Sequence, residues 1–340
     1  HSSNSKPKTH NHKPQKMTMK FTSIPEAYSS FNSPLVYEFD SEQEAKDLLV
    51  EITDLATNEV IGRKKLYAAT VGSIDIAPYL RRRAIATLPE NVAACGLVDV
   101  GVQIKVRVTI DGTASSSRNF IAAKVAPGTH YTLLTHQLLQ RTMARDEFDL
   151  IAYFAMPDAV VEVVVEATGK ERESLSFEAS GGQRVIAVTA ATFDEATEDL
   201  KVKILIDGEV ASTIDYEIKP NLDGARRIAW MNSDSSPEAY TFPLRKSVLI
   251  EATRKRIATI WGKEAAEVEH HNELKLLSAY EPKRQIEGLQ EIVASPKVWL
   301  IRGGSVQNID LRTDRLFHTL NEGMGIVELD IRSAEEGATL

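Results

Sequence analysis

The sequence contains a single cysteine, Cys95, among 340 residues. One thiol cannot form an intrachain disulfide, so the fold is stabilised without such cross-links. Cys95 sits among small residues, and the nearest histidines, His12 and His130, are distant in the sequence. We therefore interpret Cys95 as a small, partly buried hydrophobe in preference to a catalytic nucleophile.

Long apolar runs are also missing, and none approaches the roughly 20 residues that a membrane-spanning helix needs, so we expect no membrane contact. The net charge of −8 argues against nucleic-acid contact, because nucleic-acid binders usually present a basic field. The sequence has no glycine-rich phosphate loop, nucleophile elbow or paired-cysteine zinc motif. We expect a protein that is not an enzyme and that has no metal or other cofactor.

The chain exceeds the roughly 250–300 residues at which a single hydrophobic core stops growing, so several domains are expected. Residues 1–20 are predicted to form a flexible tail, because residues 1–16 are polar and basic and lack the apolar core of a secretion signal. Met17 or Met19 is a possible natural start, so the tail is either native or a remnant.

Short alternating runs indicate a first β-sandwich-like domain over residues 21–127. Ser73–Ala77 alternates with period two, and Val100–Ile110 does so over a longer span. The latter run ends at Asp111-Gly112, a dipeptide that strongly indicates a hairpin turn. Regular short strands and turns of this kind are typical of sandwiches.

The same order of strands recurs over residues 128–220, which we interpret as a second β-sandwich-like domain and a diverged copy of the first. The run Lys201–Ile206 ends at Asp207-Gly208, as Val100–Ile110 ends at Asp111-Gly112. A whole order of strands ending in the same hairpin is better explained by duplication than by chance.

Residues 221–340 are predicted to form an α+β C-terminal domain, so that the fold class is mainly β. Within Pro282–Ala294, apolar residues recur at helical spacing, namely Ile286, Leu289, Ile292 and Val293. Strands are expected on both sides of this helix, including Arg226–Met231 and Ser247–Ile257.

Charged clusters are the candidate subunit-interface residues. There are two basic runs, Arg81-Arg82-Arg83 and Arg254-Lys255-Arg256, and two acidic pairs, Asp194-Glu195 and Glu198-Asp199. The basic runs fit a solvated edge or loop, a salt-bridging contact with an acidic neighbouring subunit, or phosphate binding. Our hypothesis for the function of the protein rests on the second possibility, the contact with an acidic neighbouring subunit.

Two further groups of residues could form a catalytic or metal site, but we favour a structural interpretation of each. Glu162 and Glu166 lie on one face of a strand, as an acid/base pair would, but alternating Val/Glu is typical of any half-exposed strand. Glu269-His270-His271 suggests a metal, yet adjacent histidines rarely share one, so we predict a polar surface patch. We expect all three tryptophans to be in the core: Trp230, Trp261 and Trp299.

Several short segments resemble uncharacterised virion proteins of Bacteroidetes phages and prophages. They are Phe21–Tyr28 with Asn32–Tyr37, the Ile228–Asn232 segment with Tyr240–Phe242, and Ala294–Leu300. The chain departs from such proteins in having Ser233–Pro237 where they often carry a glycine-rich turn. The resemblance implies a structural piece of a virion, in its tail or baseplate region, with no catalytic residues to carry over.

We therefore expect a non-enzymatic assembly component of a phage or phage-like particle, a homo-oligomer that contacts itself and other virion structural proteins. It would be made in the cytoplasm of the bacterial host and reside in the virion. The alternative is a cell-surface or secreted adhesion or glycan-binding module of repeated sandwiches. Glycan-binding modules of that kind need exposed aromatic platforms.

Overall fold

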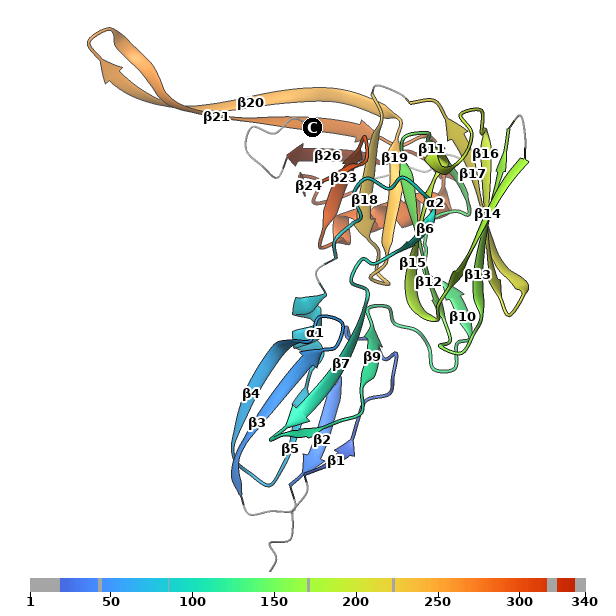
Figure 1. Cartoon of the computed structure of the whole chain (residues 1–340). Coiled ribbons are helices and arrows are strands. Elements are labelled where there is room, and N and C mark those ends of the chain that lie inside the picture. Colours follow the sequence, from blue (N-terminus) through green and yellow to red (C-terminus); the bar gives the residue numbers. More distant parts are fainter. Residues whose placement is uncertain are drawn as a thin grey trace, which may run out of the picture.

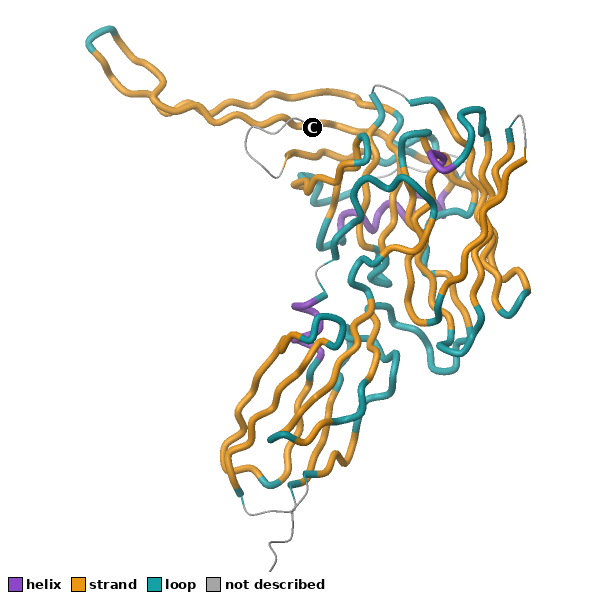
Figure 2. Tube along the Cα trace, viewed as in Figure 1, coloured by secondary structure: helices purple, strands orange, loops and turns teal. Residues whose placement is uncertain are grey.

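A computed structural model describes residues 19–41, 45–84, 86–169, 172–221, 224–316 and 323–333. Most of the predicted tail, residues 1–20, therefore lies outside the described residues. Strands make up 58% and helices 7% of the structure, with several antiparallel sheets and one sheet that curls into a half-barrel. The prediction of a mainly β fold is confirmed (Figures 1 and 2).

The N-terminal unit contains two sheets around one core. Its strands are β1 Lys20–Ser23, β2 Val36–Asp40, β3 Lys46–Asp54, β4 Glu59–Ala69, β5 Val71–Asp75, β7 Gln103–Ile110, β8 Thr113–Ala114 and β9 Arg118–Ile121. One sheet has the order β1-β2-β5 and the other β4-β3-β7-β8, with β9 also paired to β7. Alternate residues of both sheets, such as Phe39, Val50 and Val108, are buried in the same core because side chains alternate along a strand.

The second unit also contains two sheets. Its strands are β6 Gly96–Val98, β10 Tyr131–Leu133, β11 Gln140–Ala144, β12 Phe148–Ala155, β13 Val161–Thr168, β14 Arg172–Ala179, β15 Gly182–Thr189, β16 Asp199–Ile206 and β17 Glu209–Lys219. The sheets have the orders β10-β12-β15-β6 and β11-β17-β16-β13-β14. Strand β6 comes from the range predicted for the first domain, yet it pairs with β15 in the second unit.

The two units share one order of pairings. In the first, β2 pairs with β1 and β5, and β3 lies between β4 and β7; in the second, β12 pairs with β10 and β15, and β13 lies between β14 and β16. The Asp111 N–H donates to the Leu49 carbonyl over 2.9 Å, and the Asp207 N–H donates to the Val160 carbonyl over 2.8 Å. The two Asp-Gly turns thus make corresponding backbone contacts in their sheets.

The C-terminal unit is built on a seven-stranded sheet. Its elements are β18 Arg226–Met231, β19 Pro237–Phe242, β20 Leu244–Thr259, β21 Gly262–Leu277, β22 Glu281–Pro282, α2 Lys283–Ala294, β23 Val298–Arg302, β24 Ser305–Leu311, β25 Met324–Gly325 and β26 Glu328–Ser333. The sheet order is β19-β18-β23-β24-β26-β21-β20, and β22 pairs with β25. The predicted helix is confirmed as α2, which buries Ile286, Leu289 and Ile292, while Val293 is half-buried.

Strand β12 is buried along its whole length because it has a core on each face. Ile151 and Tyr153 belong to the core of the second unit, whereas Leu150 and Ala152 share a core with residues of β18 and β23. The sheet that contains β12 is therefore a middle layer, which packs against the other sheet of the second unit on one face and against the third unit on the other.

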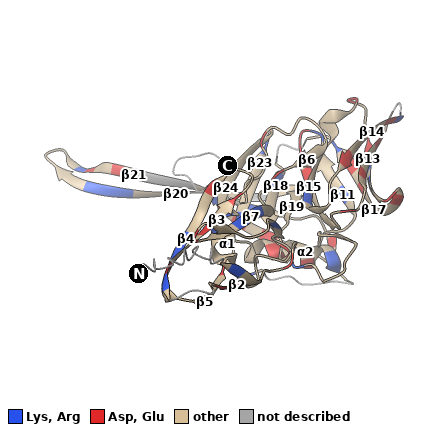
Figure 3. Ribbon diagram, turned by 60° about the horizontal axis from the view of Figure 1, so that its bottom comes forward, with Lys and Arg blue, Asp and Glu red and all other residues tan. Residues whose placement is uncertain are grey.

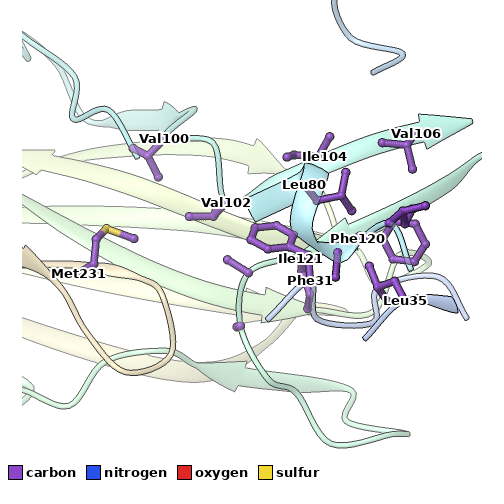
Figure 4. Close-up of a cluster of buried hydrophobic side chains, with 14 of the residues drawn as sticks. Phe31, Leu35, Leu80, Val100, Val102, Ile104, Val106, Phe120, Ile121 and Met231 are labelled. Atoms are coloured by element: carbon purple, nitrogen blue, oxygen red, sulfur yellow. The ribbon is translucent and has the colours of Figure 1, made fainter. Parts of the chain in front are cut away.

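A narrower joint connects the N-terminal unit to the rest (Figure 1). Val100 and Val102 lie between β6 and β7 and belong to the buried cluster at this joint. Met231 of β18 and Phe31 belong to the same cluster (Figure 4). All four side chains are buried. Hydrophobic residues of the first and third units thus belong to one buried cluster.

Candidate functional site

The first predicted basic run lies in a short helix, α1 Ala77–Arg83, directly after β5. Two of its three arginines bond within the chain. Arg81 Nη1 donates to the Phe31 carbonyl over 2.9 Å, and Arg83 Nε lies 3.1 Å from Asp54 Oδ2. These contacts fix α1 on its own unit and leave Arg82 as the most available cation of the run.

The second basic run, Arg254-Lys255-Arg256, lies in β20, as the predicted strand over 247–257 requires. Lys255 Nζ is 3.6 Å from Glu267 Oε2 on the neighbouring strand, and both side chains are largely exposed. An exposed pair of this kind contributes at most about 1 kcal/mol, so it does not explain the fold of this segment.

The predicted acidic residues are all exposed and lie between the 3-10 helix η1 Ala190–Thr192 and the start of β16. They are Asp194, Glu195, Glu198 and Asp199. Arg145 Nη2 holds this loop by donating to the carbonyls of Phe193 and Asp194 over 2.9 and 2.7 Å. Among the described contacts, no ion pair joins these carboxylates to either basic run of the same chain.

The least expected feature is the long hairpin formed by β20 and β21, which we call the arm. It runs past the end of β26 and projects away from the rest of the chain (Figures 1 and 2). Sequence reasoning identified β20 but missed β21, because Glu269-His270-His271 and the surrounding charges mask its alternation. The backbone of that triplet is in β21, and its side chains lie outside the described residues.

The arm ends in a two-residue turn, Ile260-Trp261, between the paired residues Thr259 and Gly262. Ile260 is 91% exposed and Trp261 is 84% exposed. The prediction that Trp261 is in the core is wrong, whereas Trp230 and Trp299 are buried as predicted. Ile260 and Trp261 form the turn at the end of the hairpin, where no other described element covers them.

An apolar stripe leads along one face of the arm toward this tip. Val248 pairs with the buried Leu274, and Arg254 pairs with Val268, so Val248, Ile250 and Val268 share a face by alternation. Each of the three is at least 49% exposed. These residues lie on the same side of the sheet as the buried Leu274. Along the arm, the described residues no longer cover that side.

A buried charge cluster joins the second and third units. Asp149 of β12 accepts from Arg141 Nη1 over 2.6 Å, from Tyr216 over 2.8 Å, and from Arg227 Nη2 over 2.7 Å. Burial alone would raise the pKa of Asp149, but the charges of Arg141 and Arg227 hold that pKa below its usual value. The cluster lines a cavity of about 400 Å³. The Asp149 carboxylate accepts from all three donors, which favours a structural role for the cluster, while Arg227 Nε is buried without a hydrogen-bond partner.

A second cluster surrounds His136. His136 Nδ1 lies 2.9 Å from Glu291 Oε1, and Nε2 lies 3.0 Å from Asp234 Oδ2. The buried Glu238 accepts from the His136 backbone N–H over 2.5 Å, and burial raises the pKa of Glu238. These contacts hold the loop before β11 against the β18–β19 turn and against α2.

The remaining predicted groups lie apart from these clusters. Cys95 is buried, with Sγ 3.4 Å from Thr192 Oγ1, which agrees with its reading as a small hydrophobe. Glu166 bonds Lys203 over 2.5 Å, and Glu162 lies opposite Glu178. Within the described ranges no group of three or more potential metal ligands comes together, and no described helix is long and apolar enough to cross a membrane.

No protein-family model matches the sequence, and none of the curated proteins matches it significantly.

Proposed function

We propose that this chain is a non-enzymatic structural component of a phage or phage-like particle, in its tail or baseplate region, and that it acts through subunit interfaces. The protein then works as a homo-oligomer in contact with other virion structural proteins, after synthesis in the cytoplasm of the host bacterium. The resemblance of its short segments to virion proteins supports this assignment.

The observation that carries the proposal is the exposed apolar tip of the arm. Burying a large apolar side chain stabilises a structure by roughly 1.5–3 kcal/mol. Trp261 does not contribute this stabilisation while the tip is exposed to water. Large, amphipathic aromatic side chains are also the ones that dominate the binding energy of protein interfaces. An arm that ends in Ile260-Trp261 is therefore suited to insertion into a neighbouring subunit.

The proposal includes the organisation of the chain. Residues 21–127 and 128–220 are then two tandem β-sandwich-like domains, the second a diverged copy of the first, followed by an α+β domain over residues 221–340. The shared order of pairings and the equivalent Asp-Gly turns support the duplication. The middle-layer position of β12 supports a rigid assembly of the last two domains.

The alternative, an adhesion or glycan-binding module, draws support from the same Trp261, because sugar rings stack on exposed aromatic side chains. Platforms of this type usually need more than one exposed ring. Trp230 and Trp299 are in the core, the exposed Tyr67 lies in β4 of a different unit, and the exposed Tyr280 follows the end of β21 opposite to the tip. We therefore rank this function second.

The decisive experiment measures the mass of the full chain by light scattering and sedimentation velocity over a wide concentration range. We expect assemblies larger than one chain, and we expect Trp261→Ser to weaken them while leaving the circular dichroism spectrum unchanged. Tyr67→Ser removes a similarly exposed ring from a different unit and is the matched control. It should leave assembly unchanged.

Mass spectrometry of particles released from the native source provides the second measurement. The chain should be found in purified particles at many copies. A chain that stays monomeric at high concentration and is missing from the particles overturns the proposal. Binding of a glycan array through Trp261 would then place the adhesion module first.

A further inference from the structure

The arm has little support from its own chain. Residue pairs from Ile250–Asn272 to Thr259–Gly262 lie beyond the last pairing of β21 with β26, at Glu273–Arg332. An isolated two-stranded hairpin is marginally stable in water, and a third strand or a packed face is needed to hold it. The length of the arm is therefore best explained by a partner that supplies that support.

Both long edges of the arm are available for pairing. Strand β20 is the last strand of the seven-stranded sheet, so no described strand pairs with its outer edge. Strand β21 pairs with β26 only through Glu273–Leu277, and no described strand occupies that edge between Gly262 and Asn272. Free edges of this kind are templates for a strand of another chain.

The two strands of the arm differ in charge. On β20, Arg254, Lys255 and Arg256 follow one another, whereas β21 carries Glu264 and Glu267 at the same level, with Lys263 nearer the tip. Figure 3 shows a basic segment on β20 and an acidic segment on β21. Each edge thus complements the opposite edge of an identical arm.

We propose that the free edge of β20 in one copy pairs antiparallel with the free edge of β21 in the next copy, so that the arms close into a ring of strands. This inference rests on the proposed function, since it names the partner of the arm as a second copy of this chain. The contact is heterologous: one copy contributes β20, and its neighbour contributes β21.

The geometry of a rotational assembly fits this pairing. When identical hairpins are related by an axis that runs along them, each β20 has the opposite direction to the β21 of its neighbour. Where neighbouring arms keep the register of a single arm, Lys255 lies opposite Glu267 of the next copy, because these two residues share one rung within an arm, and Arg254 is one rung away. A closed ring leaves no free edge, which removes the aggregation hazard of an exposed hairpin.

Charge reversal tests the pairing directly. One variant carries Arg254→Glu with Lys255→Glu, which reverses the cation opposite Glu267, and a second carries Glu264→Lys with Glu267→Lys. Each variant alone brings like charges together in every β20–β21 contact, so each should raise the concentration of half-assembly at least about tenfold. An equimolar mixture of the two variants should restore assembly, because alternating copies again place opposite charges on facing edges.

The matched control is Lys105→Glu with Arg107→Glu, two exposed cations of β7 in the N-terminal unit. It makes the same change in net charge as the β20 variant and should leave assembly unchanged. Light scattering of the full chain is the measurement, and circular dichroism verifies folding of each variant.

The outcomes separate this inference from the proposed function. Assembly of the wild-type chain with unchanged masses for both arm variants would overturn the edge pairing and leave the structural role intact. An effect of the β20 reversal alone would also overturn it and would point to contact between two β20 strands. A wild-type chain that never assembles would contradict both proposals.

Discussion

Arg227 and Asp149 are joined by a 2.7 Å hydrogen bond between Nη2 and Oδ1, and neither side chain is more than 2% exposed. Arg227 belongs to β18 of the third unit and Asp149 to β12 of the second. A second arginine, Arg141, pairs with the other carboxylate oxygen of Asp149. One carboxylate therefore compensates two buried cations at the junction of two units.

Asp149→Ala should lower the free energy of unfolding by about 3–5 kcal/mol, because it removes the carboxylate that pairs with two buried guanidinium groups and leaves Arg227 with the more distant Glu147, 3.6 Å from Nη1. Urea unfolding followed by tryptophan fluorescence reports on this junction, since Trp230 and Trp299 are buried in the third unit. Asp158→Ala, at an exposed carboxylate in the loop after β12, is the control and should change stability by less than about 0.5 kcal/mol. Equal effects of the two substitutions would contradict the assigned role of Asp149.

His136 should make stability dependent on pH. Both of its ring nitrogens face carboxylate oxygens, of Glu291 and Asp234, and only the charged imidazolium has two N–H groups to donate. Burial alone would lower the pKa of His136, but the hydrogen bond to Glu291 and the charges of Glu291 and Glu238 raise it above 6.5. The stabilisation is therefore fully present below about pH 6.5 and is lost as pH rises through the folded-state pKa.

The measurement compares wild type with His136→Gln in urea at about pH 5.5 and about pH 8.5. The wild-type advantage should be about 1 kcal/mol larger at the lower pH, a figure reduced for the partial exposure of all three side chains. His130→Gln, at a more exposed histidine beside Asp207, serves as the control. A wild-type advantage that is the same at both pH values would exclude the charged form of His136.

Leu289→Asp should destabilise the third unit by several kcal/mol, because Leu289 is fully buried beneath the sheet and the new carboxylate has no partner there. Thermal unfolding by tryptophan fluorescence measures the loss. Glu287→Ala, on the exposed side of the same helix, should have a small effect. A tolerated aspartate at Leu289 would mean that α2 does not pack as described.

The Asp-Gly turns should respond equally to substitution. Gly112 and Gly208 have φ of +83° and +85°, and an added Cβ would meet no atom within 4 Å at either position. Gly112→Ala and Gly208→Ala should therefore each cost about 1 kcal/mol through backbone conformation alone, as measured by urea unfolding. Gly96 has no positive φ, and an added Cβ would meet no atom within 4 Å there, so Gly96→Ala should change stability very little. Unequal costs at the two turns would argue against their equivalence.

The sequence was informative at several elements whose structure is decided by neighbouring residues. Alternation located β7 and β16, Asp-Gly located their turns, and helical spacing located α2 with its buried Leu289. In each case the signal lies within a few neighbouring residues, since side-chain direction and turn conformation are local properties. The absence of a disulfide followed from Cys95 alone.

Only the tertiary structure decided which surfaces are covered. Asp149 lies in an ordinary strand sequence. Its neighbours in the chain do not indicate that it binds two arginines, Arg141 and Arg227, the latter 78 positions away. Trp261 has apolar neighbours like those of a core residue, yet it is exposed because β26 stops pairing with β21 at Glu273. Burial depends on which distant segments meet, and the local pattern that forms a strand does not encode where its neighbour ends.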